Sequence, residues 1–216
     1  MNNDYLIDSN DDVKPLIITF GGISGGINQP LFEFKNFLKK NIDCHILLIR
    51  DTNQSWYHKG ILGLGKNINE LKIGIHKIIK KINYSKIITI GNSMGGYAAL
   101  LFGNLLNVDN IIAFSPQTFI DKYNRMKYND NRWENKINIV HNNHNNMYFD
   151  LLKINFKNTN VQIIYGKKCH IDKIHCERMK NKKNINILSY NGNHGIVKNL
   201  RDNGILLKII SNHIKN

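Results

Sequence analysis

The chain has few of the residues that mark several common protein classes. It contains three cysteines, Cys44, Cys169 and Cys176, in 216 residues. An odd number of widely spaced cysteines does not indicate a disulfide framework. No apolar run approaches the roughly 20 residues that a membrane-spanning helix needs. The polar start, Met1-Asn2-Asn3-Asp4, lacks the basic and then apolar segments of a signal peptide. We therefore expect a reduced, cytoplasmic protein with no membrane span.

Acidic residues are also scarce. The chain has 16 Asp and Glu against 30 Lys and Arg, a formal net charge of +14. The basic residues stand singly or in pairs, such as Lys39-Lys40 and Lys80-Lys81, and no motif that reads nucleic acid accompanies them. We expect a basic solvated surface and no nucleic-acid partner. A non-catalytic module that binds a partner through this basic surface remains an alternative.

The pattern of apolar residues predicts the fold class. A length of 216 residues with 42% hydrophobic residues suits a single domain, residues 1–216. Short apolar runs typical of buried strands alternate with helical patterns, which favours an α/β fold: a mostly parallel twisted sheet with helices on both faces. We expect strands at 16–20, 44–49, 86–90, 110–114, 161–165 and 185–190, and helices at about 30–40, 68–82, 94–106, 172–180 and 196–213.

Two segments depart from this alternation. The first dozen residues are polar, and we expect them to be irregular. The segment from about 116 to 160 is rich in asparagine and has scattered aromatic residues. We interpret it as a small insertion over the carboxyl edge of the sheet that acts as a lid or cap. Of its aromatic residues, Trp133 and Tyr123 are candidates to line a pocket.

The strongest local motif is Gly91-Asn92-Ser93-Met94-Gly95, which has the form G-x-S-x-G. An apolar strand-like run precedes it and an apolar helical run follows it, which is the context that a nucleophile elbow requires. Glycines two residues from the serine relieve the crowding of such a tight turn. The turn exposes the hydroxyl of Ser93 above the sheet edge and directs the Met94 N–H toward the oxygen of a bound carbonyl.

With this motif in place, the chain resembles the α/β-hydrolase superfamily from about Leu16 to its end. The segments 114–119 and Arg132-Trp133 are similar to a subgroup of small bacterial serine hydrolases. The resemblance implies the chain order serine, acid, histidine. It places the histidine in the loop after the last strand, where this sequence has His194 between Gly192 and Gly195.

The same resemblance places the acid after the strand at 161–165, where Asp172 stands. Its carboxylate would orient His194 and stabilise the imidazolium. Asp172 also opens a helical stretch, so a helix-capping role is compatible with the position. Asp121 and Asp150 are the alternative acids.

A second donor to the oxyanion should come from the glycine-rich loop after the first buried strand. We favour the N–H of Gly22, with Ile23 as the alternative and as a pocket-lining candidate, because glycine lets the backbone approach a substrate closely. The superfamily commonly has a His-Gly pair at this strand end, whereas this chain has Phe20-Gly21.

Two other motifs invite different interpretations. Cys169, His170, His175 and Cys176 form C-H-x4-H-C, but adjacent Cys-His pairs are poorly spaced for one tetrahedral zinc site. The loop from Gly21 to Gly26 lacks the spacing of a phosphate-binding loop. We therefore expect no metal and no cofactor.

These observations predict a serine hydrolase that cleaves an ester or thioester through Ser93, His194 and Asp172. Its partner would be a small acyl ester, and the basic surface suggests anionic or saccharide-linked esters. An acyltransferase on the same triad is the alternative, because the two reactions differ only in what accepts the acyl group.

Overall fold

A computed structural model of the chain describes residues 4–23, 32–143, 146–156 and 158–215. Seven strands form one sheet: β1 (Tyr5–Asp8), β2 (Lys14–Phe20), β3 (His45–Ile49), β4 (Tyr84–Asn92), β5 (Asn110–Phe114), β6 (Asn160–Gly166) and β7 (Ile185–Tyr190). The helices are α1 (Lys35–Asn41), α2 (Ile68–Ile79), α3 (Met94–Leu106), α4 (Lys122–Tyr128), α5 (Glu134–Asn143), α6 (His170–Glu177), α7 (Ile196–Asp202) and α8 (Ile205–Lys215), with short 3-10 turns η1 (Asn146–Tyr148) and η2 (Leu151–Lys153).

The sheet has the strand order β1-β3-β2-β4-β5-β6-β7. All neighbouring strands are parallel except β1, which pairs antiparallel with β3. The predicted parallel α/β sheet is confirmed. The expectation that the first dozen residues are irregular was wrong for residues 5–8. Their backbone hydrogen bonds are satisfied by the outer edge of β3, with Leu6 opposite Leu48.

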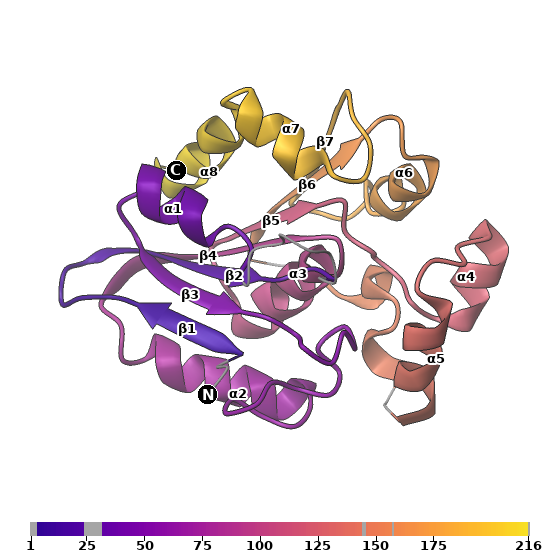
Figure 1. Cartoon of the computed structure of the whole chain (residues 1–216), viewed down its shortest axis with the longest axis horizontal. Helices are drawn as coiled ribbons and strands as arrows, with labels where there is room; N and C mark the ends of the chain where they lie inside the picture. Colours follow the sequence, from indigo (N-terminus) through magenta and orange to yellow (C-terminus); the bar gives the residue numbers. More distant parts are fainter. Residues whose placement is uncertain (1–3, 24–31, 144–145, 157, 216) are drawn as a thin grey trace.

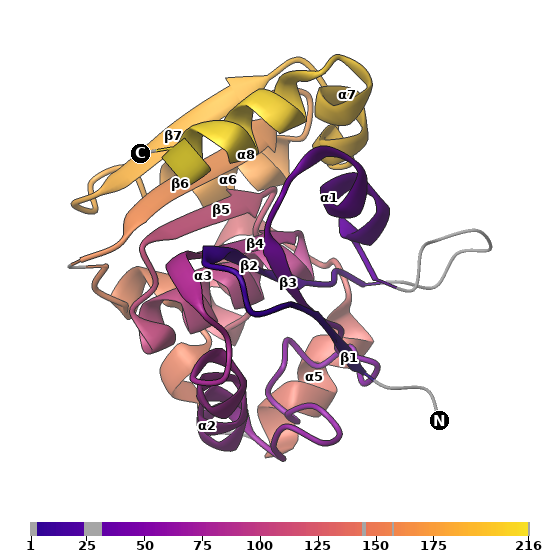
Figure 2. The ribbon, with the colours of Figure 1, turned by 90° about the vertical axis from the view of Figure 1, so that its left-hand side faces the viewer.

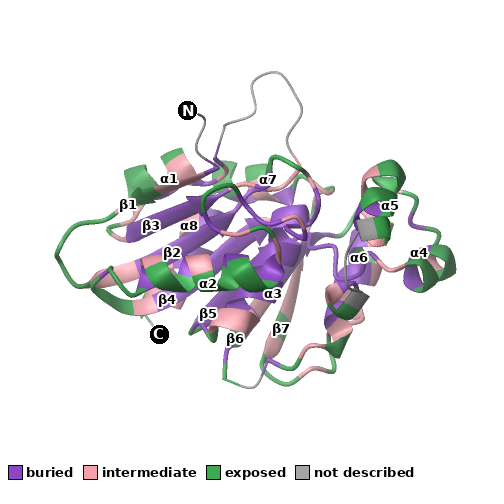
Figure 3. Ribbon diagram, turned by 90° about the horizontal axis from the view of Figure 1, so that it is seen from below, coloured by how far each residue is buried: buried purple, intermediate pink, exposed green. Residues whose placement is uncertain are grey.

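Helices cover both faces of the sheet (Figures 1 and 2). One hydrophobic core joins the sheet to α2 and α3, and a second joins it to α1, α7 and α8. The central strands are buried on both sides, which explains their continuous apolar runs (Figure 3). No helix in the described part of the chain is long and apolar enough to cross a bilayer.

The segment at about 116–160 contains more regular structure than the sequence suggested. It forms α4, α5, η1 and η2, which lie with α6 at one side of the sheet (Figures 1 and 3). The helix expected at 196–213 is instead two helices, α7 and α8. The chain turns between them at Gly204, whose φ of +70° is readily adopted only by glycine.

Because the inner strands run parallel, their carboxyl ends meet at one edge of the sheet. The segments that follow β2, β4, β6 and β7 therefore converge there. These are the segments in which the sequence predicts functional residues.

Candidate active site

Ser93 lies in a strained turn between β4 and α3. Its backbone has φ 57° and ψ −118°, a conformation that L-residues rarely adopt. A Cβ at Gly91 would lie 2.0 Å from the carbonyl oxygen of Gly95, and a Cβ at Gly95 would lie 2.1 Å from that of Phe20. Both positions therefore require glycine. The Ser93 N–H donates to the carbonyl of Phe114 at 2.8 Å and fixes the turn to β5.

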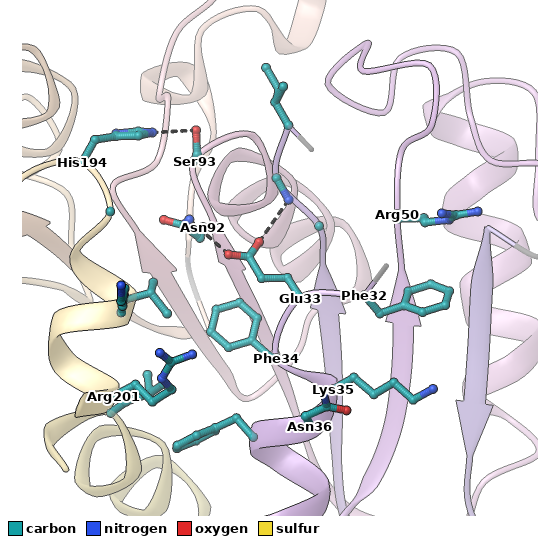
Figure 4. Close-up of a pocket in the computed structure, with 18 of the residues that line it drawn as sticks. Phe32, Glu33, Phe34, Lys35, Asn36, Arg50, Asn92, Ser93, His194 and Arg201 are labelled. Atoms are coloured by element: carbon teal, nitrogen blue, oxygen red, sulfur yellow. Dashed lines mark hydrogen bonds between the residues drawn. The ribbon is translucent and has the colours of Figure 1, made fainter. Parts of the chain in front are cut away.

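His194 lies in the loop between β7 and α7. This loop packs against the one that follows β6, since the Lys168 N–H donates to the Gly192 carbonyl at 2.9 Å. The structure places His194 Nε2 3.0 Å from Ser93 Oγ and His194 Nδ1 2.7 Å from Asp172 Oδ2 (Figure 4 shows the first of these bonds). Three residues predicted from separate parts of the sequence thus form one hydrogen-bonded line.

The protonation state of Asp172 determines which ring nitrogen of His194 carries the proton. Asp172 is fully buried in the first turn of α6. Burial raises the pKa of its carboxyl, but the hydrogen bond from His194 and the charge of Arg132 lower it by more, so the pKa lies below its usual range. An ionised carboxylate only accepts hydrogen bonds, so Nδ1 of His194 carries the proton. Nε2 is then free to accept the proton of the Ser93 hydroxyl.

The alternative acids lie elsewhere. Asp121 caps α4, where its carboxylate accepts the Asn124 N–H at 2.9 Å. Asp150 forms a bidentate ion pair with Arg178 at 2.6 and 3.1 Å. Of the three candidate acids, Asp172 is the one that the structure joins to His194.

The predicted oxyanion donors differ in their surroundings. Met94 is the first residue of α3, where backbone N–H groups have no partner within the helix. The Gly22 N–H instead donates to Glu33 Oε2 at 3.1 Å. The favoured second donor is therefore already engaged in this structure, and the N–H of Ile23, the alternative, is the next one along the loop.

Glu33 was not identified from the sequence. Its carboxylate bridges the loop after β2 and the elbow, because Oε1 accepts the side-chain amide of Asn92 at 3.1 Å while Oε2 accepts the Gly22 N–H (Figure 4). Burial raises the pKa of Glu33 above its usual range, and these two hydrogen bonds oppose that rise. A lone glutamate in a segment that the sequence assigned to a helix carries no pattern that would reveal this contact.

A cavity of about 650 Å³ opens at Ser93 and His194. Ile23 and Trp133 line it as expected, but Tyr123 does not: it lies on the outer side of α4 and is 71% exposed. Trp133 is the residue that the insertion contributes to the described lining, and the lid role of that segment stays a prediction. Among the described lining residues, the charged side chains are Glu33 and the cations Lys35, Arg50, Lys198 and Arg201. Two of these cations are paired with carboxylates outside the lining, Arg50 with Asp4 and Arg201 with Asp202, so the lining is basic overall.

The four residues of the C-H-x4-H-C motif have different surroundings. His175 and Cys176 are buried, and His175 is hydrogen-bonded to Asp130 and Thr118. Within the described ranges, one set of metal-type side chains converges, namely Cys169, Asp172 and His194. An ion there would replace the His194–Asp172 hydrogen bond, so we assign this set no metal. The loop considered for phosphate lies partly outside the described residues, at 24–26.

Known structures share this architecture. The capsule O-acetyltransferase of Neisseria meningitidis serogroup A has a TM-score of 0.69 and 21% identity, covering 98% of this chain and 91% of that one. A variant of it was solved in complex with CoA. An alpha/beta hydrolase from lagoon-sediment metagenome of Mar Chica, Morocco, has a TM-score of 0.61 and 16% identity, over 96% of this chain and 94% of that one.

The fluorophosphonate-binding serine hydrolase F of Staphylococcus aureus has a TM-score of 0.61 and 11% identity, covering 92% of this chain and 84% of that one. No protein-family model matches the sequence, and no curated protein does. At these identities the comparisons establish the fold. The chain has the α/β-hydrolase fold, as the resemblance predicted.

Proposed function

We propose that the chain is a serine-dependent enzyme that cleaves an ester or thioester through a covalent acyl-enzyme. The observation that carries this proposal is the line Ser93 Oγ, His194 Nε2, His194 Nδ1 and Asp172 Oδ2, with separations of 3.0 and 2.7 Å at its two hydrogen bonds. A serine hydroxyl is a weak nucleophile and needs a base at this distance.

In the first half-reaction, Ser93 Oγ bonds to the acyl carbon as its proton passes to His194 Nε2. The carbonyl electron pair moves to oxygen, where the Met94 N–H stabilises the negative charge. Gly22 joins it only if Glu33 releases the Gly22 N–H; otherwise the Ile23 N–H is the candidate. When the carbonyl re-forms, the alkoxide or thiolate leaves with the proton from Nε2.

In the second half-reaction, water donates a proton to His194 Nε2 as its oxygen attacks the acyl carbon of the acyl-enzyme. Collapse of this second intermediate releases the acid and returns the proton to Ser93. Throughout, the Asp172 carboxylate stabilises the imidazolium without taking the proton.

Labelling with a fluorophosphonate probe tests the proposal, since the probe reacts with activated serines. We expect wild-type protein to be labelled, and Ser93→Ala and His194→Ala to lose labelling. Ser85→Ala is the matched control, because Ser85 is exposed near the other end of the same strand, β4. A folded wild-type protein that is not labelled would contradict the proposal and favour the non-catalytic binding module.

Acyl transfer is the second candidate, and the basic lining favours it. Even with Arg50 paired to Asp4 and Arg201 paired to Asp202, the described lining carries more positive than negative charge, which suits an acyl donor that carries negative charge. A structural neighbour is named as an O-acetyltransferase and was solved with CoA, which is consistent with such a donor.

Intact-protein mass spectrometry distinguishes the two candidates. Acetyl-CoA and p-nitrophenyl acetate would each be mixed with the protein, with and without a saccharide acceptor. Transfer predicts that acetyl-CoA acetylates Ser93 and that the acceptor accelerates turnover. Hydrolysis predicts release of acetate at a rate that the acceptor does not change.

A further inference from the structure

Both oxygens of the Asp172 carboxylate are engaged. Oδ2 faces His194, and Oδ1 accepts a hydrogen bond from Nη1 of Arg132 at 2.8 Å. Arg132 comes from the segment between α4 and α5, 40 residues before Asp172 in the sequence. This contact joins the insertion to the centre of the site.

Arg132 is itself held by a second acid, Asp130. Its Nε donates to Asp130 Oδ1 at 2.9 Å and its Nη2 donates to Asp130 Oδ2 at 3.0 Å. Such a two-point pair fixes the plane of a guanidinium, which a lysine ammonium cannot reproduce. The position of Nη1 against Asp172 is therefore set by Asp130.

Asp130 is anchored in turn by His175. His175 Nε2 lies 2.9 Å from Asp130 Oδ2, and the Thr118 N–H donates to His175 Nδ1 at 3.0 Å. Because Nδ1 accepts, Nε2 carries the proton and donates to the carboxylate. His175 and Asp172 are three residues apart on α6, so they lie on the same side of that helix and hold the 130–132 segment together.

The net charge of Asp130, Arg132 and Asp172 bears on how well Asp172 can stabilise a protonated His194. Arg132 alone would neutralise Asp172 and weaken its stabilisation of a positive imidazole. Asp130 supplies the counter-charge, so Asp130, Arg132 and Asp172 together carry one negative charge. That charge matches the single positive charge that His194 gains when Ser93 is acylated. A further cation, Arg125, holds the backbone of this turn: its Nε donates to the Asp130 carbonyl at 3.0 Å and its Nη2 to the Arg132 carbonyl at 3.2 Å, and it is kept in every variant compared below. The other titratable groups around the cluster are Cys169 and Cys176, together with the neutral His175.

We propose that Arg132 is a positioning residue for the triad: clamped by Asp130, it fixes the carboxylate of Asp172 while leaving its charge available to His194. The inference rests on the function proposed above. It also gives the insertion a specific task, because the next residue, Trp133, lines the cavity with a left-handed backbone of φ 55°. One short turn thus contacts both the pocket and the acid of the triad.

The test compares Arg132→Met, Arg132→Lys and Asp130→Asn by the rate of fluorophosphonate labelling as a function of pH. The control is Arg178→Met, because Arg178 forms a similar bidentate pair with Asp150 and also joins α6 to the insertion. We expect Arg132→Met to slow labelling by about 10²-fold, the effect of a misplaced catalytic group. Arg132→Lys should recover part of the rate, and Arg178→Met should label like wild type.

The pH profiles should move in opposite directions. Without Arg132, two neighbouring carboxylates lack their cation. Their excess negative charge favours an imidazolium at His194, which cannot take the Ser93 proton, so labelling should fail at a higher pH than in wild type. Without the Asp130 charge, Arg132 neutralises Asp172, so the acid limb should move to lower pH. A residue that only supports the fold would not produce this opposition.

Two outcomes separate the proposals. If wild-type protein is labelled and all three variants match Arg178→Met in rate and profile, the assignment of Arg132 is wrong and the proposed function stands. If wild-type protein is not labelled, the proposed function itself fails. Should Arg132→Met not fold by circular dichroism, Arg132→Lys and Asp130→Asn carry the same comparison.

Discussion

Two aspartate–histidine pairs lie on either side of Arg132 in the described part of the chain, and their surroundings differ although their residue types are the same. Asp172–His194 has a separation of 2.7 Å and Asp130–His175 one of 2.9 Å. The His194 side chain is 38% exposed and its other nitrogen faces Ser93. The His175 side chain is 0% exposed, and its other nitrogen accepts a backbone N–H.

This difference separates a histidine whose surroundings suit the proposed role of base from one whose surroundings exclude it. Phe119 stacks on the ring of His175 at 3.9 Å, and the Thr118 N–H occupies its lone pair. It has no free acceptor and no access to a substrate, so it serves as a neutral donor. His194 has the same type of acidic partner, but its free lone pair is directed at a hydroxyl inside a cavity.

The largest expected effect comes from making the same substitution in both pairs. His194→Gln should lower the rate of fluorophosphonate labelling by roughly 10³-fold or more, because it removes the base while Ser93 stays in place. Its melting temperature should stay close to that of wild type, since His194 is partly exposed.

His175→Gln is the matched variant. It should label within about tenfold of wild type but lose about 1–3 kcal/mol of unfolding free energy, because it disturbs a buried hydrogen-bonded network. Urea unfolding and labelling kinetics measure both quantities. Equal loss of labelling in the two variants would break the distinction between the pairs.

The second prediction concerns pH and stability. Burial lowers the pKa of His175 to about 4. The unfolded chain therefore takes up a proton near pH 6.5 that the folded chain refuses until about pH 4. As far as His175 is concerned, the free energy of unfolding is at its full value above pH 6.5. It should fall by on the order of 3 kcal/mol as the pH drops to 4.

Urea unfolding between pH 7 and 4.5 checks this slope, and His175→Gln should flatten it. Burial also lowers the pKa values of His141 and His213, so part of the slope should remain in the variant. The lowered pKa values of Asp130 and Asp172 act at lower pH, since their contribution is lost only below the ordinary aspartate range. A slope equal to that of wild type in the variant would show that His175 is not the group responsible.

The smallest predicted effect concerns the cavity at Ser93, which His194 lines and His175 does not. Lys198→Ala combined with Arg201→Ala should lower kcat/KM for acetyl-CoA by about tenfold, because two cations of the lining are lost. The uncharged ester p-nitrophenyl acetate should react at nearly the wild-type rate. Lys77→Ala, exposed on α2 against the other core, is the control. Equal effects on both substrates would argue against recognition of a charged donor.

The sequence predicted those parts of the site that follow regular strands. Ser93, Asp172 and His194 each stand shortly after an apolar run, and parallel strands bring such positions to one edge. The elbow could be recognised because the motif itself contains the glycines that the tight turn requires for steric reasons.

The remaining parts depend on contacts between segments with no periodic pattern. Arg132 meets Asp172 only because α4, α5 and α6 gather on one side of the sheet, which polar, asparagine-rich sequence did not reveal. Glu33 is similar, since its partners Gly22 and Asn92 follow different strands. The pairing of β1 was missed because a strand of four residues inside a polar segment gives too short an apolar pattern and is stabilised by its neighbour β3.

The most direct test of the central claim is peptide mapping of the fluorophosphonate adduct in wild type, His194→Gln and His175→Gln at neutral pH. The account predicts a single adduct on Ser93 in wild type, the same adduct in folded His175→Gln, and none in His194→Gln. An adduct on another residue, or labelling of Ser93 that does not depend on His194, would contradict it.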